Sequence, residues 1–205
     1  MNHSKFFLTL IVAFLSVTFL SAQTIWYVND DNAPGGDGTS WATAFNDLQT
    51  AIMAANTDFS TQHIYVAMGT YKPTASMDRG VSFFISRPMK IYGGFPNTGN
   101  PTLAERDPIN FPTILSGDIG IPNDNSDNSY HVVHLQGFFN KNTNSLDGLI
   151  IQDGNANGDI DTNTNPNAQW HWKRGGGLFI ESQMEADFTQ GIIEGMTFIL
   201  SLIHI

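Results

Sequence analysis

The most unusual cluster of side chains in this sequence is Trp170-His171-Trp172-Lys173-Arg174, in which two indoles flank a histidine and two cations follow. Indole rings present flat apolar faces beside a polar N–H group, and such rings stack well on sugars at a hydrated surface. In an extended backbone both tryptophans would share one face, with His171 and Lys173 on the other. The cluster is therefore a candidate ligand-binding site, and its alternative is packing against the body of the fold.

A second candidate site is a polar segment that follows the opening of an EF-hand calcium loop. Its oxygen-bearing side chains alternate along the chain and are Asp153, Asn155, Asn157, Asp159 and Asp161. Gly158 occupies the sixth loop position, but Thr164 replaces the bidentate glutamate of the twelfth. We expect either a Ca²⁺ site of the weak extracellular type, with a Kd on the order of 10⁻⁴ to 10⁻³ M, or a polar loop without an ion. Ca²⁺ is the only cofactor that the sequence suggests.

Other patterns that carry chemistry are missing from the sequence. His131 and His134 lie three positions apart in an expected strand, so we expect them on opposite faces rather than as a metal pair. The chain has no cysteine, which excludes thiol nucleophiles and thiolate metal sites. A serine nucleophile elbow, a phosphate loop and a zincin helix are also absent from the sequence.

Composition narrows the class of protein that must position these side chains. The chain has 205 residues and a net charge of −10, with 19 Gly, 9 Pro and only 14% charged residues. Few charges and many turn formers favour a β-rich fold over a helical bundle. The acidic balance, without a basic cluster, argues against nucleic acid as a partner.

The N-terminus has the pattern of a secretory signal over residues 1–22. Lys5 precedes an apolar run from Phe6 to Leu20, and Ser21-Ala22 offers small residues for cleavage. A membrane anchor is the alternative, but the run is shorter than the roughly 20 residues that a spanning helix needs. We expect a mature chain from Gln23 without a membrane span, secreted or on the outer cell surface, and long enough for one domain.

The first elements after this signal predict a compact cap over residues 23–62. Thr24–Val28 is a β-branched and aromatic run that ends in a dense Asn/Asp/Gly turn. Apolar residues then recur at helical spacing, so we expect an amphipathic helix over Thr43–Ala55 with Ser40 or Thr43 as its N-cap.

Beyond the cap, six short apolar runs follow one another at intervals of 17 to 29 residues. Their central residues are Val66, Ile91, Leu115, Val133, Ile150 and Phe179. Each run is too short to bury a face alone, but stacked as parallel rungs the runs would share one core. The connections are too short for crossover helices. An antiparallel sandwich also suits this spacing, although two-residue hairpin turns of the Asn-Gly type do not link the runs.

The fold predicted is all-β, a right-handed parallel β-helix (a solenoid) over residues 63–194. The cap strand and the one amphipathic helix would cover its N-terminal end, because an open end exposes backbone groups and apolar side chains. Residues 195–205 are apolar and lack a turn signal. We expect this tail to be incomplete or artefactual, and the chain to be truncated at its C-terminus.

Several segments combine glycine with aromatic and β-branched residues in a distinctive order. They are Val28-Asn29-Asp30, Gly36–Phe45, Ile64–Ala67, Ile91–Phe95, Leu115–Asp118 and Leu146–Ile151. Together they resemble the N-terminal region of secreted right-handed β-helix repeat proteins of the pectin-lyase-like type, found especially in Bacteroidetes. The resemblance covers most of Thr24–Ile180 and implies the architecture, but a shared fold does not confer a reaction.

Pectate-lyase-type enzymes, which this chain resembles in fold, bind Ca²⁺ at an acidic cluster and remove the sugar's C5 proton with a basic side chain. The acids and bases that could match this scheme are Asp118, Asp147, Asp153, Arg87, Arg106 and Arg174. The alternative is that these aspartates bond turn amides at the ends of rungs.

The sequence thus predicts a secreted or cell-surface β-helix protein with a structural, adhesive or glycan-binding role and no readable catalytic site. Its expected partner is a polysaccharide or a cell-surface glycan. The alternative is a polysaccharide lyase or glycoside hydrolase on a pectin-lyase-like scaffold, and in either case Ca²⁺ could serve only to rigidify loops.

Overall fold

The computed structural model describes residues 24–58, 62–136, 145–158, 170–181, 193–194 and 197–199. The expected signal over residues 1–22 lies outside this part of the chain. Of the expected tail, only Thr197–Ile199 is described, and it forms a strand. Across the described ranges, no helix has the length and apolarity needed to cross a membrane.

Three sheets make up most of the structure, and neighbouring strands are parallel throughout. The first sheet contains β1 (Thr24–Val28), β2 (Gln62–Ala67), β5 (Met89–Phe95), β8 (Ser145–Asp147) and β11 (Ile193–Glu194). The second contains β3 (Gly69–Tyr71), β6 (Thr113–Ser116), β9 (Leu149–Gln152) and β12 (Thr197–Ile199). The third contains β4 (Phe83–Ile85), β7 (Val133–Gln136) and β10 (Leu178–Glu181).

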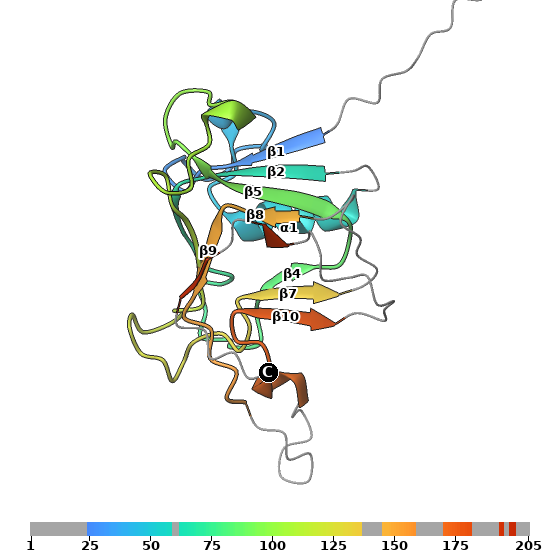
Figure 1. Ribbon diagram of the computed structural model, residues 1–205, viewed down its shortest axis with the longest axis vertical. Helices are drawn as coiled ribbons and strands as arrows, with labels where there is room; N and C mark the ends of the chain where they lie inside the picture. Colours follow the sequence, from blue (N-terminus) through green and yellow to red (C-terminus); the bar gives the residue numbers. More distant parts are fainter. Residues whose placement is uncertain are drawn as a thin grey trace, which may run out of the picture.

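The chain visits these sheets in a repeating order. From β2 onward it passes through the first, second and third sheet in turn, so that β5 returns beside β2, β6 beside β3 and β7 beside β4. Figure 1 shows the resulting stacks, with β1, β2 and β5 in one and β4, β7 and β10 in another. The expectation of a mostly β fold with parallel strands and one α-helix is confirmed for the described residues.

The spacing predicted that each apolar run stacks on the next, and this holds only for the first two runs, because Ile64–Ala67 in β2 pairs with β5. Ile91 of β5 pairs with Ile64 and Leu146 of the first sheet, whereas Leu115 of β6 pairs with Tyr71 and Ile151 of the second. From Ile91 onward, successive runs therefore belong to different sheets. The reason is that the chain forms one short strand in each of the three sheets before it returns to the first sheet.

The expected helix begins later than its apolar pattern predicted. Residues Trp41–Thr43 form a short 3₁₀ helix, η1, and α1 spans Leu48–Thr57. Between them the backbone of Phe45 bridges to β1, accepting a bond from Asn29 N at 2.8 Å. Asp47 then caps α1, because its carboxylate accepts bonds from two backbone amides of the first turn.

The core lies between the sheets and is completed by α1. Leu48, Ala51, Ile52 and Ala55 form the buried face of this helix, at the spacing that the sequence indicated. They pack in one apolar cluster with inward side chains of all three sheets, and α1 contacts β1, β2 and β4. The strands alternate inward and outward residues, so each sheet also has an outer face that the core does not cover.

Candidate functional site

The outer face of the first sheet carries a row of three tyrosines, which we call the tyrosine face. Tyr27, Tyr65 and Tyr92 occupy matching positions on β1, β2 and β5. The ring centroid of Tyr65 lies 5.9 Å from that of Tyr27 and 5.9 Å from that of Tyr92, at interplanar angles of 85° and 80°. Tyr65 is almost enclosed, whereas its two neighbours are half-buried. The result is a row of aromatic rings with partly exposed edges.

Two aromatic side chains support this row from the side where the strands end. Phe95 is fully buried and stacks on Tyr65 with centroids 4.7 Å apart. Trp41 of η1 meets Tyr27 at 4.9 Å, and its indole nitrogen donates to the Pro101 carbonyl at 2.8 Å. Because these contacts leave the rings little room to turn, the tyrosine face is preorganised.

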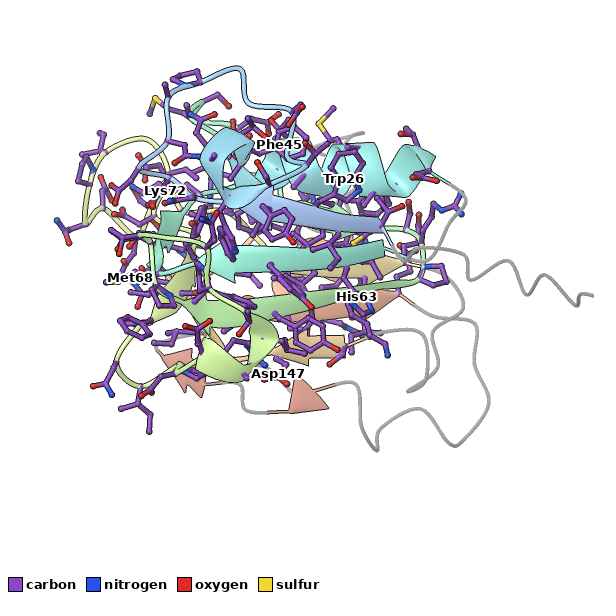
Figure 2. The ribbon with its side chains drawn as sticks, turned by 90° about the horizontal axis from the view of Figure 1, so that it is seen from above. Trp26, Phe45, His63, Met68, Lys72 and Asp147 are labelled. Carbon is purple, nitrogen blue, oxygen red and sulfur yellow. The ribbon has the colours of Figure 1, made fainter. Side chains whose placement is uncertain are left out.

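A histidine and a lysine lie beside the tyrosines toward the start of the strands. His63 of β2 and Lys90 of β5 are in register, and both are half-buried. The His63 ring lies 5.7 Å from Tyr92 and 6.4 Å from Tyr65. Burial, and secondly the charge of Lys90, lower the pKa of His63. The site therefore combines aromatic surface with a cation and the neutral imidazole of His63, which is labelled in Figure 2.

Asp147 continues the tyrosine row on β8 and is neutralised by Arg106. The two side chains form an ion pair at 2.9 Å, and the guanidinium also donates to the Gly93 carbonyl at 2.7 Å. Arg106 directly follows the 3₁₀ helix η2 (Leu103–Glu105), which a Thr102–Glu105 capping interaction holds in place. Gly148, with φ +68°, leaves room for the guanidinium that a Cβ would occupy.

The acids and bases implied by the lyase resemblance do not form one site. Besides Arg106 and Asp147, Asp118 and Asp153 are linked through Ser116, whose hydroxyl donates to the Asp153 carboxylate at 2.8 Å and accepts from the backbone amide of Asp118 at 3.2 Å. Lys72 joins them through an ion pair with Asp118 at 3.4 Å. Lys72 lies at the opposite end of the molecule from His63 in Figure 2.

Arg87 and Arg174, the other two expected bases, lie outside the strands. Arg87 is half-buried in the connection between β4 and β5, and Arg174 is exposed after the 3₁₀ helix η3 (Trp170–Lys173).

The tryptophan cluster adopts a backbone different from the extended one considered above. Because residues 170–173 form η3, the strand alternation does not apply to them. Trp172 is half-buried and stacks on Tyr130 at 4.7 Å, while Lys173 and Arg174 are exposed. The side chains of Trp170 and His171 lie outside the described part of the structure. Glycan binding by this cluster stays a prediction.

In the calcium-loop segment, several oxygens already accept hydrogen bonds within the protein. Ser116 donates to the Asp153 carboxylate at 2.8 Å, and Arg79 donates to the side-chain oxygen of Asn157. The side-chain amide nitrogen of Asn155 donates to the carbonyl of Asn125, in the segment between β6 and β7. Asp159 and Asp161 lie outside the described residues, so a Ca²⁺ site here stays a prediction.

His131 and His134 lie closer together than strand alternation predicted. Strand β7 begins at Val133, so His131 precedes the alternation, and the two ring centroids are 6.1 Å apart. The His134 ring also lies 3.3 Å from Glu181. Even so, within the described ranges no three His, Asp or Glu side chains group as a metal ion would require.

The tyrosine face did not emerge from the motifs, although the sequence contains its signal. Each tyrosine stands in a strand between two residues of opposite orientation: Trp26 and Val28, Ile64 and Val66, Ile91 and Gly93.

No protein-family model, curated protein or solved structure matches this chain.

Proposed function

We propose that this protein is a right-handed parallel β-helix whose outer surface binds glycans. The repeated order of the three parallel sheets supports the solenoid, because each strand lies beside the strand of the previous circuit. Crossovers between parallel strands are right-handed in nearly all proteins. The position of α1 against β1, β2 and β4 fits a cap over the first circuit.

The tyrosine face is the observation that carries the binding function. Sugar rings have apolar C–H faces, and aromatic side chains with polar edges bind them at wet surfaces. Tyr27 and Tyr92 are half-buried on the outside of a sheet, where they pack against a second apolar cluster, that of Trp41, Tyr65, Ala67 and Phe95, and not against the central core. Burial raises the pKa of Tyr65, so its phenol stays protonated at neutral pH and can donate a hydrogen bond.

Binding to a panel of soluble polysaccharides tests this proposal, for example by affinity electrophoresis followed by calorimetry. Removing the ring in Tyr27→Ala or Tyr92→Ala should weaken binding about tenfold, which corresponds to ~1.4 kcal/mol. Trp172→Ala is the matched control, since it removes an aromatic ring from the other candidate surface. Binding that depends on Trp172 and not on the tyrosines would move the site to η3, and absence of binding across the panel would overturn the function.

A polysaccharide lyase or hydrolase is the second candidate, favoured by the link of Asp118 and Asp153 through Ser116 and by the ion pair of Asp118 with Lys72. Such an enzyme needs carboxylates and a base within reach of one sugar. Release of unsaturated or reducing ends, lost in Asp118→Asn, would support it. Intact polymer after prolonged incubation with the full chain would remove it.

We also place the protein outside the producing cell, on the strength of the signal pattern in residues 1–22. Sequencing the N-terminus of protein recovered from the cell exterior tests this location. A start at Gln23 would support it, and protein retained inside the cell with residues 1–22 attached would contradict it.

A further inference from the structure

The charges around the tyrosine face differ from those of the chain as a whole. The protein carries 19 acidic against 9 basic residues. On the outer face of the first sheet, however, the acidic residue that continues the tyrosine row, Asp147, is already paired with Arg106 at 2.9 Å. Lys90 remains, and it makes no ion pair with any other described residue.

Lys90 lies where a bound glycan would place its substituents. It is two residues before Tyr92 on the same strand, so both side chains leave the same face of the sheet. Its register neighbours are Ile25 and His63 on one side, through β2, and Ser145 on the other. Among these groups only His63 titrates near neutral pH, and none carries negative charge.

We propose that the tyrosine face selects glycans that carry anionic groups, with Lys90 contacting the anion and His63 beside it. This inference rests on the proposed glycan binding and names the class of glycan. A carboxylate or sulfate next to a half-buried ammonium forms a charge-assisted hydrogen bond, which is stronger than a bond between neutral groups. Charges farther than about 8 Å are largely screened at physiological ionic strength, so the net acidity of the chain does not cancel this local attraction.

Protonation of His63 adds a second positive charge to the same place. Since burial and Lys90 lower the pKa of His63, the imidazole is neutral at pH 7 and becomes charged only in more acidic solution. Affinity for an anionic glycan should therefore rise as the pH falls through the His63 titration, as long as the anion itself stays ionised.

The test compares binding of the full chain to a uronate polymer, a sulfated polymer and a neutral polymer of similar length. Lys90→Met keeps an unbranched apolar stem at this position while it removes the charge. We expect it to weaken binding of an anionic polymer about tenfold, to flatten the salt dependence, and to leave neutral-polymer binding unchanged. Lys90→Arg should restore much of the affinity, and Lys72→Met, at the far end of the molecule, should have no effect.

The outcomes separate this inference from the proposed function. The uronate and sulfate arms identify which anion is bound, and a response of either arm to Lys90→Met supports the inference. Binding that needs Tyr92 but not Lys90, with neutral and anionic polymers bound equally, would overturn the charge selection and keep the glycan-binding function. Absence of binding to all three polymers would overturn both.

Discussion

Arg106 links two neighbouring strands of the first sheet, β5 and β8, and its loss should cost more stability than the loss of any exposed charge. The guanidinium donates to the Gly93 carbonyl at 2.7 Å, to the Asp147 carboxylate at 2.9 Å and to the Asp147 carbonyl at 3.1 Å. It also lies 5.0 Å from the centre of the Tyr92 ring. Gly93 belongs to β5 and Asp147 to β8, so one side chain bonds consecutive strands of the first sheet.

The magnitude follows from the exposure of the two partners. The Arg106 side chain is 14% exposed and that of Asp147 is 27% exposed. Hydrogen bonds to charged groups contribute about 1.5–3 kcal/mol each, and breaking a fully buried pair costs about 3–5 kcal/mol. Because Asp147 keeps some contact with water, we expect Arg106→Ala to lower the free energy of unfolding by about 2–4 kcal/mol.

Urea denaturation followed by tryptophan fluorescence measures this change as a shift of the midpoint. Lys72→Ala is the matched control, because Lys72 is 38% exposed and its ion pair with Asp118 is longer, at 3.4 Å. Such an exposed pair should contribute less than about 1 kcal/mol. A double-mutant cycle of Arg106→Ala with Asp147→Asn isolates the pair itself. An Arg106→Ala loss no greater than that of Lys72→Ala would refute the reasoning.

Three further predictions concern close packing, a buried hydroxyl and a titrating ring. Gly154→Ala should strongly destabilise the protein in urea denaturation, because the new Cβ would overlap the Gly176 carbonyl. Wild-type stability of this variant would show that the backbone segments at Gly154 and Gly176 can move apart. Tyr71→Phe should cost about 1–2 kcal/mol, since the hydroxyl donates to a buried carbonyl at 3.1 Å, and an unchanged midpoint would contradict this. For His63 the folded pKa lies below the ordinary 6.5, so stability is lost as the pH falls below that value. In Lys90→Met, an NMR titration should show the pKa of His63 rising only part of the way to the ordinary 6.5, because the imidazole is still buried. A full return to 6.5 would show that Lys90, and not burial, is the main cause of the lowered pKa.

The strands could be predicted from the sequence because apolar periodicity is a local property. Runs such as Ile64–Ala67 and Leu149–Ile151 fall within β2 and β9. The start of α1 could not be predicted from periodicity alone. Phe45 fits the apolar pattern of the helix, but its backbone bonds the edge of β1, and this contact depends on how distant segments meet.

The candidate site shows the same division between local pattern and spatial pairing. The tyrosines alternate with inward residues, so their orientation could have been derived from the sequence. Their alignment across β1, β2 and β5 depends on register, which no motif states. The meeting of Arg106 with Asp147, 41 positions along the chain, likewise depends on which strands become neighbours. The sequence offered six candidate acidic and basic residues but did not show which of them lie together in the fold.

The register of the first sheet is independent of the length of chain between its strands. Ile91 pairs with Ile64 and Leu146 pairs with Ile91, although the second connection contains roughly twice as many residues as the first. Doubling the length of a flexible loop costs only about 0.6 kcal/mol of closure entropy. The loops within these connections can therefore gain or lose residues through evolution while the strand ladder stays intact. This separation lets mutation reshape the surface of the molecule without endangering its folding, and it makes the exposed residues 121–123, between β6 and β7, a natural place to graft a foreign peptide.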